Sequence, residues 1–323
     1  MEKSEFLSSC GADTIKRAAR SLINGNLVAF PTETVYGLGA DALNSSAVAR
    51  IYDVKGRPHD HPLIVHIHNL NAIDQWVRDI PEYAIQLARD YWPGPMTLIL
   101  NRSKIAGDFI TGGQNTLGIR IPDHPIALAL LNSFNEMGGK GVAAPSANRF
   151  GHVSPTSARA VSQEISEYLR NSDMILDGSE CRVGVESTII DCTGSLPVVL
   201  RPGAISEEMI EESVNLKVKG NSKQNTSRVS GMLEKHYSPM SKVFLDQTPV
   251  LGQGYLALSN IDTPPGVVRL GAPINIEEFA RVLYQSLRRA DELKLQSLVV
   301  QQPEGEGLAI AIRDRLAKAV NGR

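Results

Sequence analysis

The sequence has little cysteine and no long apolar run. Its 323 residues include three cysteines, Cys10, Cys181 and Cys192, and none belongs to a CxxC pair. A disulfide framework and a cysteine-rich zinc site are therefore not expected. No stretch approaches the roughly 18 consecutive apolar residues of a membrane span, and residues 1–13 contain no apolar core of a secretory signal. We expect a cytoplasmic protein that has no membrane partner.

The sequence also lacks an excess of charge of either sign. Lysine and arginine number 33 and the acidic residues 35, which leaves a net charge of −2. Such a chain has no global basic field that would attract nucleic acid or anionic lipid. The 27 glycines and 18 prolines fall well short of a low-complexity composition. At about 150 residues per domain, the length predicts roughly two domains.

Short apolar runs alternate with helical patterns through the first two-thirds of the chain. Helices are predicted from a cap at Asp13 to a stop at Gly25, and over 44–54, 71–78, 82–91 and 125–136. Such alternation with strand-like runs favours an α/β fold. Turns rather than helices separate the last strand-like runs before residue 206, which predicts a mixed sheet rather than a purely parallel one.

The composition changes after residue 206. Four glutamates within 207–212 indicate a last helix, and the polar segment GNSKQNTSRVSG that follows has no periodicity. We predict one domain over 1–206, a linker over 207–241, and a second, smaller α/β domain over 242–323.

Common catalytic signatures are missing from the sequence. There is no P-loop, no HExxH and no G-x-S-x-G motif. The segment GQGYLA (252–257) weakly resembles a dinucleotide fingerprint, but it continues as an apolar strand, which favours a hairpin turn. Four histidines lie within 59–68, and His66 and His68 would share one face of a strand. A metal site is conceivable there, but one functional histidine is the favoured interpretation.

Two segments suggest ligand chemistry. PTETVYGLGADA (31–42) follows a predicted strand, and its threonines and glycines suit either a ligand loop or a capped strand-to-helix turn. Lys55 and Arg57 flank a glycine after a helix. They suit a phosphate chain, although taken alone they are better explained as cations that complement the helix dipole.

Three further segments repeat this pattern of polar residues at strand ends. In VAAPSANRFGHVSPT (142–156) the polar side chains suit either a nucleotide or simple turns and caps. Arg120 in GIRIPDHP is either exposed or a buried anchor for an anion. VGVESTIIDC (183–192) and VVLRPG (198–203) add another hydroxyl and arginine. No nucleophile–base pair stands out, so we predict a pocket for a polyanion and a small polar molecule, with catalysis by positioning and charge neutralisation.

The ordered set of motifs resembles a known family. PTETVYGLGADA, KGRPHDHPLIVHI, GPMTLIL, GIRIPDHP, APSANRFGHVSPT, GVESTIID and VLRPG occur in the order seen in YrdC-like domains. GMLEKHYSP then resembles the linker of the two-domain threonylcarbamoyl-AMP synthases. The resemblance is close over residues 12–240 and looser after Lys242. It implies an α/β fold with a twisted mixed sheet of the YrdC-like type and a second, smaller α/β domain.

The resemblance also implies an activity. The family condenses L-threonine, bicarbonate or CO2, and ATP into L-threonylcarbamoyladenylate and pyrophosphate, a nucleotidyltransferase reaction. The product serves threonylcarbamoyl modification of the tRNA adenosine beside the anticodon. The implied cofactor is Mg²⁺ with ATP, without an organic cofactor or a resident metal. The implied partners are downstream tRNA-modifying threonylcarbamoyl transferase proteins, with tRNA itself as a further candidate.

Site residues follow from the resemblance position by position. The catalytic set is Lys55, Arg57, Ser146 and Asn148. The L-threonine set is Thr34, His66, Arg120, Ala144 and Ser187. The ATP set is Arg57, His61, Thr116, Ser146, Ser154, Arg201 and Tyr237. The chain departs from the family at His59 and His61, where the usual KGRPSDNPL has serine and asparagine.

Two other functions remain open at this point. One is RNA binding by a YrdC-like module without catalysis. The other is carbamoyl transfer by a member of the wider superfamily, although the acylphosphatase-like and zinc-finger segments of those larger proteins are missing from this sequence.

Overall fold

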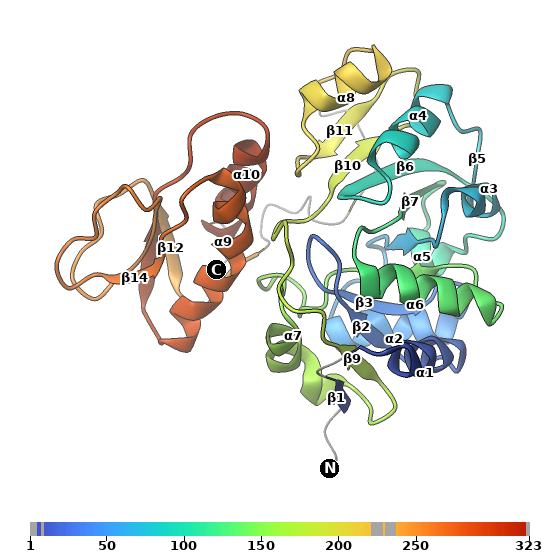
Figure 1. Ribbon diagram of the computed structural model, residues 1–323, viewed down its shortest axis with the longest axis horizontal. Helices are drawn as coiled ribbons and strands as arrows, with labels where there is room; N and C mark the ends of the chain where they lie inside the picture. Colours follow the sequence, from blue (N-terminus) through green and yellow to red (C-terminus); the bar gives the residue numbers. More distant parts are fainter. Residues whose placement is uncertain (1–4, 8–9, 221–228, 230–236, 321–323) are drawn as a thin grey trace.

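A computed structural model describes residues 5–7, 10–220, 229 and 237–320 of the chain (Figure 1). Within these residues, one sheet has eleven strands and a second sheet has four. Figure 1 shows the second sheet and its two helices, in orange and red, beside the larger part of the molecule. We call the two regions the large lobe and the small lobe.

The large lobe alternates strands and helices up to residue 214. Its strands are β1 (Glu5–Leu7), β2 (Val28–Phe30), β3 (Gly37–Asp41), β4 (Ile64–His66), β5 (Val77–Arg78), β6 (Met96–Arg102), β7 (Thr116–Arg120), β8 (Val142–Ala143), β9 (Met174–Leu176), β10 (Thr188–Asp191) and β11 (Val198–Arg201). Its α-helices are α1 (Ala12–Ile23), α2 (Ser45–Lys55), α3 (Ile73–Trp76), α4 (Glu82–Tyr91), α5 (Asp108–Thr111), α6 (Pro125–Glu136), α7 (Ala158–Ile165) and α8 (Glu207–Val214). Two 3₁₀ helices cover Leu70–Ala72 and Ser166–Tyr168.

The large sheet is mixed, as predicted. Its order is β1-β9-β2-β3-β8-β4-β7-β6-β10-β11, and β5 pairs with β6. The sheet contains parallel pairs such as β4–β7 and antiparallel pairs such as β6–β7. β7 runs parallel to β4, so Arg120 at the end of β7 lies beside His66 at the end of β4. β8 runs antiparallel to β4, so the residues that follow β8 lie beside Ile64 at the start of β4.

Local sequence explains how the helices next to the site begin and end. The Asn44 side chain accepts a hydrogen bond from the Ala47 N–H at the start of α2, and Gly56 ends that helix at φ +62°. Lys55 and Arg57 therefore flank a fixed turn. At α6, Pro125 occupies the first turn and the His124 ring accepts from the Ile126 N–H. This helix spans the residues that the sequence predicts.

The small lobe is a parallel sheet with two helices. It contains β12 (Lys242–Leu245), β13 (Gly254–Leu256), β14 (Val268–Gly271), α9 (Ile276–Glu292), β15 (Ser297–Val300) and α10 (Leu308–Val320). Its strand order is β12-β15-β13-β14. The two lobes share a hydrophobic cluster, because Val153 and Val185 of the large lobe pack with Phe279 and Leu283 of α9.

Several local predictions are wrong. Residues 37–41 form strand β3 rather than a loop, because β2 and β8 supply hydrogen-bonding partners on both sides. Residues 77–78 leave the helical segment and pair with β6. The turn at Gly252 is not part of a hairpin, since β13 pairs in parallel with β14 and β15. Gly11, not Asp13, is the N-cap of α1, and Asp13 lies in its first turn.

Residues 207–214 of the predicted linker form α8, and residues 221–228 and 230–236 lie outside the described part of the chain. Among the described residues, no helix combines the length and the apolar character that a membrane crossing requires.

Candidate active site

Most of the predicted site residues meet in one pocket of the large lobe, at the ends of neighbouring strands. The pocket is lined by Thr32, Thr34, Val35, Gly37, Arg57, Ile64, His66, Arg120, Ala144, Pro145, Ser146, Glu186, Arg201 and Tyr237. Three lining residues are arginines and one, Glu186, is acidic, so the wall suits an anion. A β-bridge between Gly37 and Ser146 joins the predicted ligand segments 31–42 and 142–156 at this pocket.

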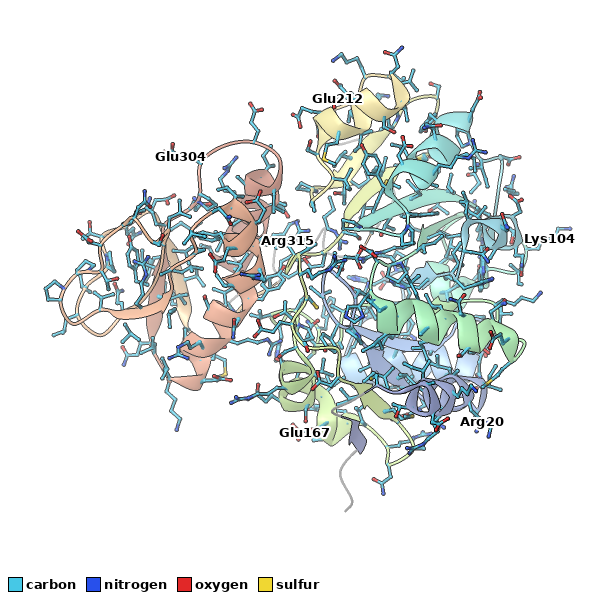
Figure 2. All side chains as sticks on the ribbon, in the orientation of Figure 1. Arg20, Lys104, Glu167, Glu212, Glu304 and Arg315 are labelled. Carbon is cyan, nitrogen blue, oxygen red and sulfur yellow. The ribbon has the colours of Figure 1, made fainter. Side chains whose placement is uncertain are left out.

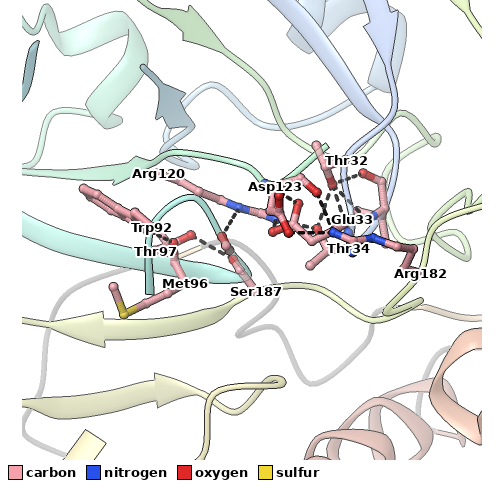
Figure 3. Close-up of polar contacts among 12 residues, drawn as sticks. Thr32, Glu33, Thr34, Trp92, Met96, Thr97, Arg120, Asp123, Arg182 and Ser187 are labelled. Atoms are coloured by element: carbon pink, nitrogen blue, oxygen red, sulfur yellow. Dashed lines mark hydrogen bonds and ion pairs between the residues drawn. The ribbon is translucent and has the colours of Figure 1, made fainter. Parts of the chain in front are cut away.

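The sequence leaves open whether Arg120 is exposed or buried, and the structure shows that it is buried. It ends β7 and keeps 5% of its surface exposed. Its Nη2 lies 2.7 Å from Glu33 Oε1 and donates to Thr34 Oγ1 at 2.9 Å. Figure 3 shows the guanidinium pointing toward both residues. Strand β7 thus delivers a fixed cation to the threonine-rich turn.

The turn itself is built by Thr32. Its Oγ1 donates to the Val35 carbonyl at 2.6 Å and accepts from the Thr34 and Val35 N–H groups. Thr32 therefore acts as the turn-forming residue of the capped-turn interpretation. Because the turn is closed in this way, Thr34 is held against Arg120 and on the pocket wall.

Lys55 lies behind the pocket wall rather than in it. Its Nζ donates to the carbonyls of Ser146 (2.5 Å) and Asn148 (2.6 Å). Burial lowers the Lys55 pKa well below its usual value, and the Arg57 charge lowers it further. Asn148 Nδ2 in turn donates to the carbonyls of Arg149 and His152. Both residues therefore brace the loop that presents Ser146.

Arg57 and His66 reach the pocket with different charges. Burial lowers the pKa of Arg57 to about 10, so the guanidinium remains charged near neutral pH. His66, on β4, has its pKa lowered to about 3 by burial and by the Arg120 charge. It therefore offers a neutral imidazole.

Two other predicted residues lie directly against lining residues. Ser154 Oγ donates to Glu186 Oε1 at 2.6 Å. Ser187 Oγ accepts from Arg201 Nη2 at 3.1 Å and lies 2.8 Å from Thr97 Oγ1. Ser154 and Ser187 thus form a second layer around the pocket.

Thr116 and His61 are also missing from the described pocket lining. Thr116 lines a neighbouring hollow, and Ile64 is the one described residue that this hollow shares with the main pocket. The His61 ring contacts Phe150 edge-on, with the ring centres 5.4 Å apart. His59 stacks on Tyr52 at 4.6 Å. Both histidines that depart from the family motif therefore pack against aromatic rings.

Tyr237 joins the site from the start of the small-lobe segment. A β-bridge between His152 and Ser238 places Tyr237 beside the segment 142–156. Tyr237 has φ +61°, a conformation that costs a bulky residue free energy and is often found at functional sites. Its ring stacks on Tyr284 with the centres 5.6 Å apart.

Sequence reasoning missed Glu186, Tyr284 and Arg315. Glu186 stands inside the motif GVESTIID, in which Ser187 alone was predicted as a site residue. The signal at this position is an acidic residue between apolar Val185 and polar Ser187. The partners of Glu186 lie 98 and 129 residues further along the chain, so local sequence carries no sign of them.

The described residues do not form a resident metal site. Among them, no group of three or more His, Cys, Asp or Glu residues is placed to hold a metal ion. Glu186, the single carboxylate of the described pocket lining, is already bound to Arg315 and Tyr284.

Comparisons with known proteins decide the family. Residues 20–203 match the model of a family described as "Telomere recombination", and residues 205–320 match that of "Threonylcarbamoyl-AMP synthase, C-terminal domain". The threonylcarbamoyl-AMP synthase of Pyrococcus abyssi is 39% identical over 94% of this chain and 93% of its own length. The chain belongs to the threonylcarbamoyl-AMP synthase family.

Other members of the threonylcarbamoyl-AMP synthase family agree over both lobes. The Bacillus subtilis relative is 38% identical over 96% of this chain and 93% of its own. A crystal structure titled P. abyssi Sua5 complexed with L-threonine has a TM-score of 0.88 and 36% identity, and covers 99% of this chain and 98% of that one. These matches confirm the family and the fold predicted from the motifs.

Proposed function

We propose that this protein makes L-threonylcarbamoyladenylate and pyrophosphate from L-threonine, bicarbonate or CO2, and ATP, for threonylcarbamoyl modification of tRNA. The observation that carries the proposal is the pocket lined by Arg57, Arg120 and Arg201, in a chain that matches threonylcarbamoyl-AMP synthases over nearly its whole length. The product would pass to a threonylcarbamoyl transferase that acts on tRNA. Buried thiols at Cys181 and Cys192, both unpaired, fit the reducing cytoplasm.

The proposed reaction has two steps. The threonine amine adds to CO2 and loses a proton, which gives a carbamate. A carbamate oxygen then attacks the α-phosphorus of ATP, the bond between the α-phosphorus and the bridging oxygen breaks, and pyrophosphate leaves. Both reactants are anions, so the main task of the protein is to hold them together against their mutual repulsion.

The pocket residues divide between the two substrates. We assign the threonine carboxylate to Arg120 and Thr34, which are held together at one end of the pocket. Arg57 and Arg201 would bind the nucleotide phosphates, with Ser146 presented by the loop that Lys55 braces. The neutral His66 imidazole offers a hydrogen bond but is a poor base at a pKa of about 3.

Magnesium would enter as the counter-ion of ATP. The described residues offer no carboxylate cluster for it, whereas the phosphate oxygens of a nucleotide are ligands that Mg²⁺ prefers. When bound, the ion would neutralise phosphate charge. Our assignment gives the protein residues the tasks of binding and orienting both substrates.

A pyrophosphate-release assay tests the proposal. We expect release only when ATP, Mg²⁺, L-threonine and bicarbonate are all present, with the adenylate identified by mass spectrometry. Arg57→Ala should lower kcat/KM by roughly 100-fold, because it removes a buried charged hydrogen-bond donor from the anion site. The control is Arg20→Ala on the exposed side of α1 (Figure 2), with unchanged rates. RNA binding without threonine-dependent release would contradict the proposal.

A further inference from the structure

The small lobe touches the pocket through two buried side chains. Arg315 on α10 donates from Nε to Glu186 Oε2 at 2.9 Å, and the Tyr284 hydroxyl on α9 donates to the same oxygen at 2.8 Å. Arg315 and Tyr284 are 1% and 0% exposed. Figure 2 shows Arg315 at the boundary between the lobes. A carboxylate of the pocket wall is thus held by the other lobe.

Other contacts fix Arg315 in this place. Its Nη2 donates to the Pro202 carbonyl at 3.0 Å, beside the pocket arginine at position 201. Its Nη1 pairs with Asp314 at 2.6 Å, and Lys318 pairs with the same Asp314 oxygen at 2.8 Å. The guanidinium also lies 5.5 Å from the centre of the Tyr237 ring. Because Lys318 balances Asp314, the Arg315 charge remains directed at Glu186.

The charge of Glu186 matters because it faces an anion pocket. Burial by itself raises the Glu186 pKa, but the charges of Arg315 and Arg201 and the hydrogen bond from Ser154 outweigh it and lower the pKa to about 2. The carboxylate is therefore ionised at neutral pH. An ionised, uncompensated carboxylate in a low-dielectric wall would repel the phosphates of a nucleotide.

We propose that Arg315 is a positioning residue of the ATP site: from the small lobe it fixes the Glu186 carboxylate and cancels its charge, so that the pocket accepts a polyanion. The inference rests on the proposed function, because it takes ATP as the polyanion. It assigns the small lobe a task in substrate binding, which it shares with Arg201 and Ser154 of the large lobe. The same contact orients Ser154, whose hydroxyl donates to the other oxygen of Glu186.

The test is a double-mutant cycle on the full chain at pH 8, where Glu186 remains ionised even if its pKa rises. Arg315→Met should raise the KM for ATP about tenfold, with kcat changed less than about threefold, because the unpaired carboxylate repels bound phosphate. Arg315→Met combined with Glu186→Gln should bring the KM back to within about threefold of the wild type. Glu186→Gln alone closes the cycle and gives the coupling between the two residues.

Three further variants separate charge from folding. Arg313→Met on the same helix is the matched control, because Arg313 donates to the Pro303 and Gly305 carbonyls within the small lobe; the ATP KM of this variant should not change. Arg315→Lys keeps the charge and should retain most of the ATP affinity. If Arg315→Met does not fold at the assay temperature, Arg315→Gln keeps a neutral donor and should show the same rise in KM.

The outcomes are distinguishable. No threonine-dependent pyrophosphate release by the wild type would overturn the proposed function. An active wild type with an unchanged ATP KM in Arg315→Met would overturn only the role of Arg315. So would a double variant that binds ATP as weakly as Arg315→Met. Melting temperatures of all variants identify any loss that comes from unfolding.

Discussion

At the scale of single residues, His66 shows how burial sets a charge state in this pocket. It is 4% exposed, and burial together with the nearby Arg120 charge lowers its pKa to about 3. In the unfolded chain a histidine has a pKa of about 6.5. Between these values the unfolded state binds more protons, so the free energy of unfolding rises with pH. This stabilising contribution is complete above about pH 6.5 and is lost as the pH falls toward 3.

We therefore predict that His66→Gln flattens the pH dependence of stability. Between pH 5 and 6 the wild type should lose about 1.4 kcal/mol per pH unit more than the variant, the value for one proton. Urea unfolding at several pH values measures the two slopes. Glu186 should not disturb this window, because its pKa is lowered to about 2 and its contribution is lost only below the usual glutamate range. Equal slopes for the wild type and His66→Gln would contradict this prediction, because they would show that native His66 takes up a proton between pH 5 and 6.

Residue types at strand ends predicted much of the pocket wall. Thr34, Arg57, Arg120, Ser146 and Arg201 lie in segments that the sequence singled out and were assigned to the site by the family resemblance, and all five line the pocket. Their catalytic and binding roles stay predictions until the assays above are done. The sequence could not indicate which protein side chain each of these residues contacts. Arg120, for example, pairs with Glu33, and such contacts join segments that are distant in the chain.

At the scale of elements, periodic and capped segments were predictable and strand β3 was not. Helix α4 occupies the predicted residues because its apolar positions repeat with helical period. Strand β3 reads Gly-Leu-Gly-Ala-Asp, and glycine, alanine and aspartate are all uncommon in strands. Pairing with β2 and β8 overrides this local preference. Tertiary context, which a local pattern does not contain, therefore decides this element.

Close packing at β3 gives a second prediction. A Cβ at Gly39 would lie 2.8 Å from the Phe30 ring and 2.8 Å from Val142, and 3.1 Å from the Val28 carbonyl oxygen. Gly39→Ala should therefore lower the free energy of unfolding by about 1–3 kcal/mol, as overpacking does. Chemical denaturation gives the value. Gly11→Ala is the control, because a Cβ at Gly11 has nothing within 4 Å; an equal loss in both variants would refute the packing argument.

At the scale of the whole molecule, the 184–186 loop of the large lobe makes one of the contacts between the lobes. Gly184 has φ +82°, and a Cβ there would lie 2.4 Å from the Arg281 Cα and 2.5 Å from the Ala280 carbonyl oxygen on α9. The next residues are Val185, buried in the shared cluster, and Glu186, bound by Arg315. Sequence patterns predicted two lobes but did not indicate this contact. The contact depends on the close approach of the Gly184 backbone to the backbone of α9, and these two segments are about 100 residues apart in the chain.

Gly184→Ala should therefore push the lobes apart without changing any polar residue. The added methyl group meets helix backbone, which cannot move aside as a flexible side chain would. We expect a lower melting temperature by calorimetry and, because Arg315 is drawn away from Glu186, a rise in the ATP KM of about the tenfold size expected for Arg315→Met.

Gly252→Ala is the matched control: Gly252 also has φ +82°, but a Cβ there has nothing within 4 Å. Gly252→Ala introduces backbone strain of about 1–2 kcal/mol but no clash, so the ATP KM of this variant should stay at the wild-type value. Equal KM values in the two variants would mean that α9 does not hold the 184–186 loop in place for ATP binding.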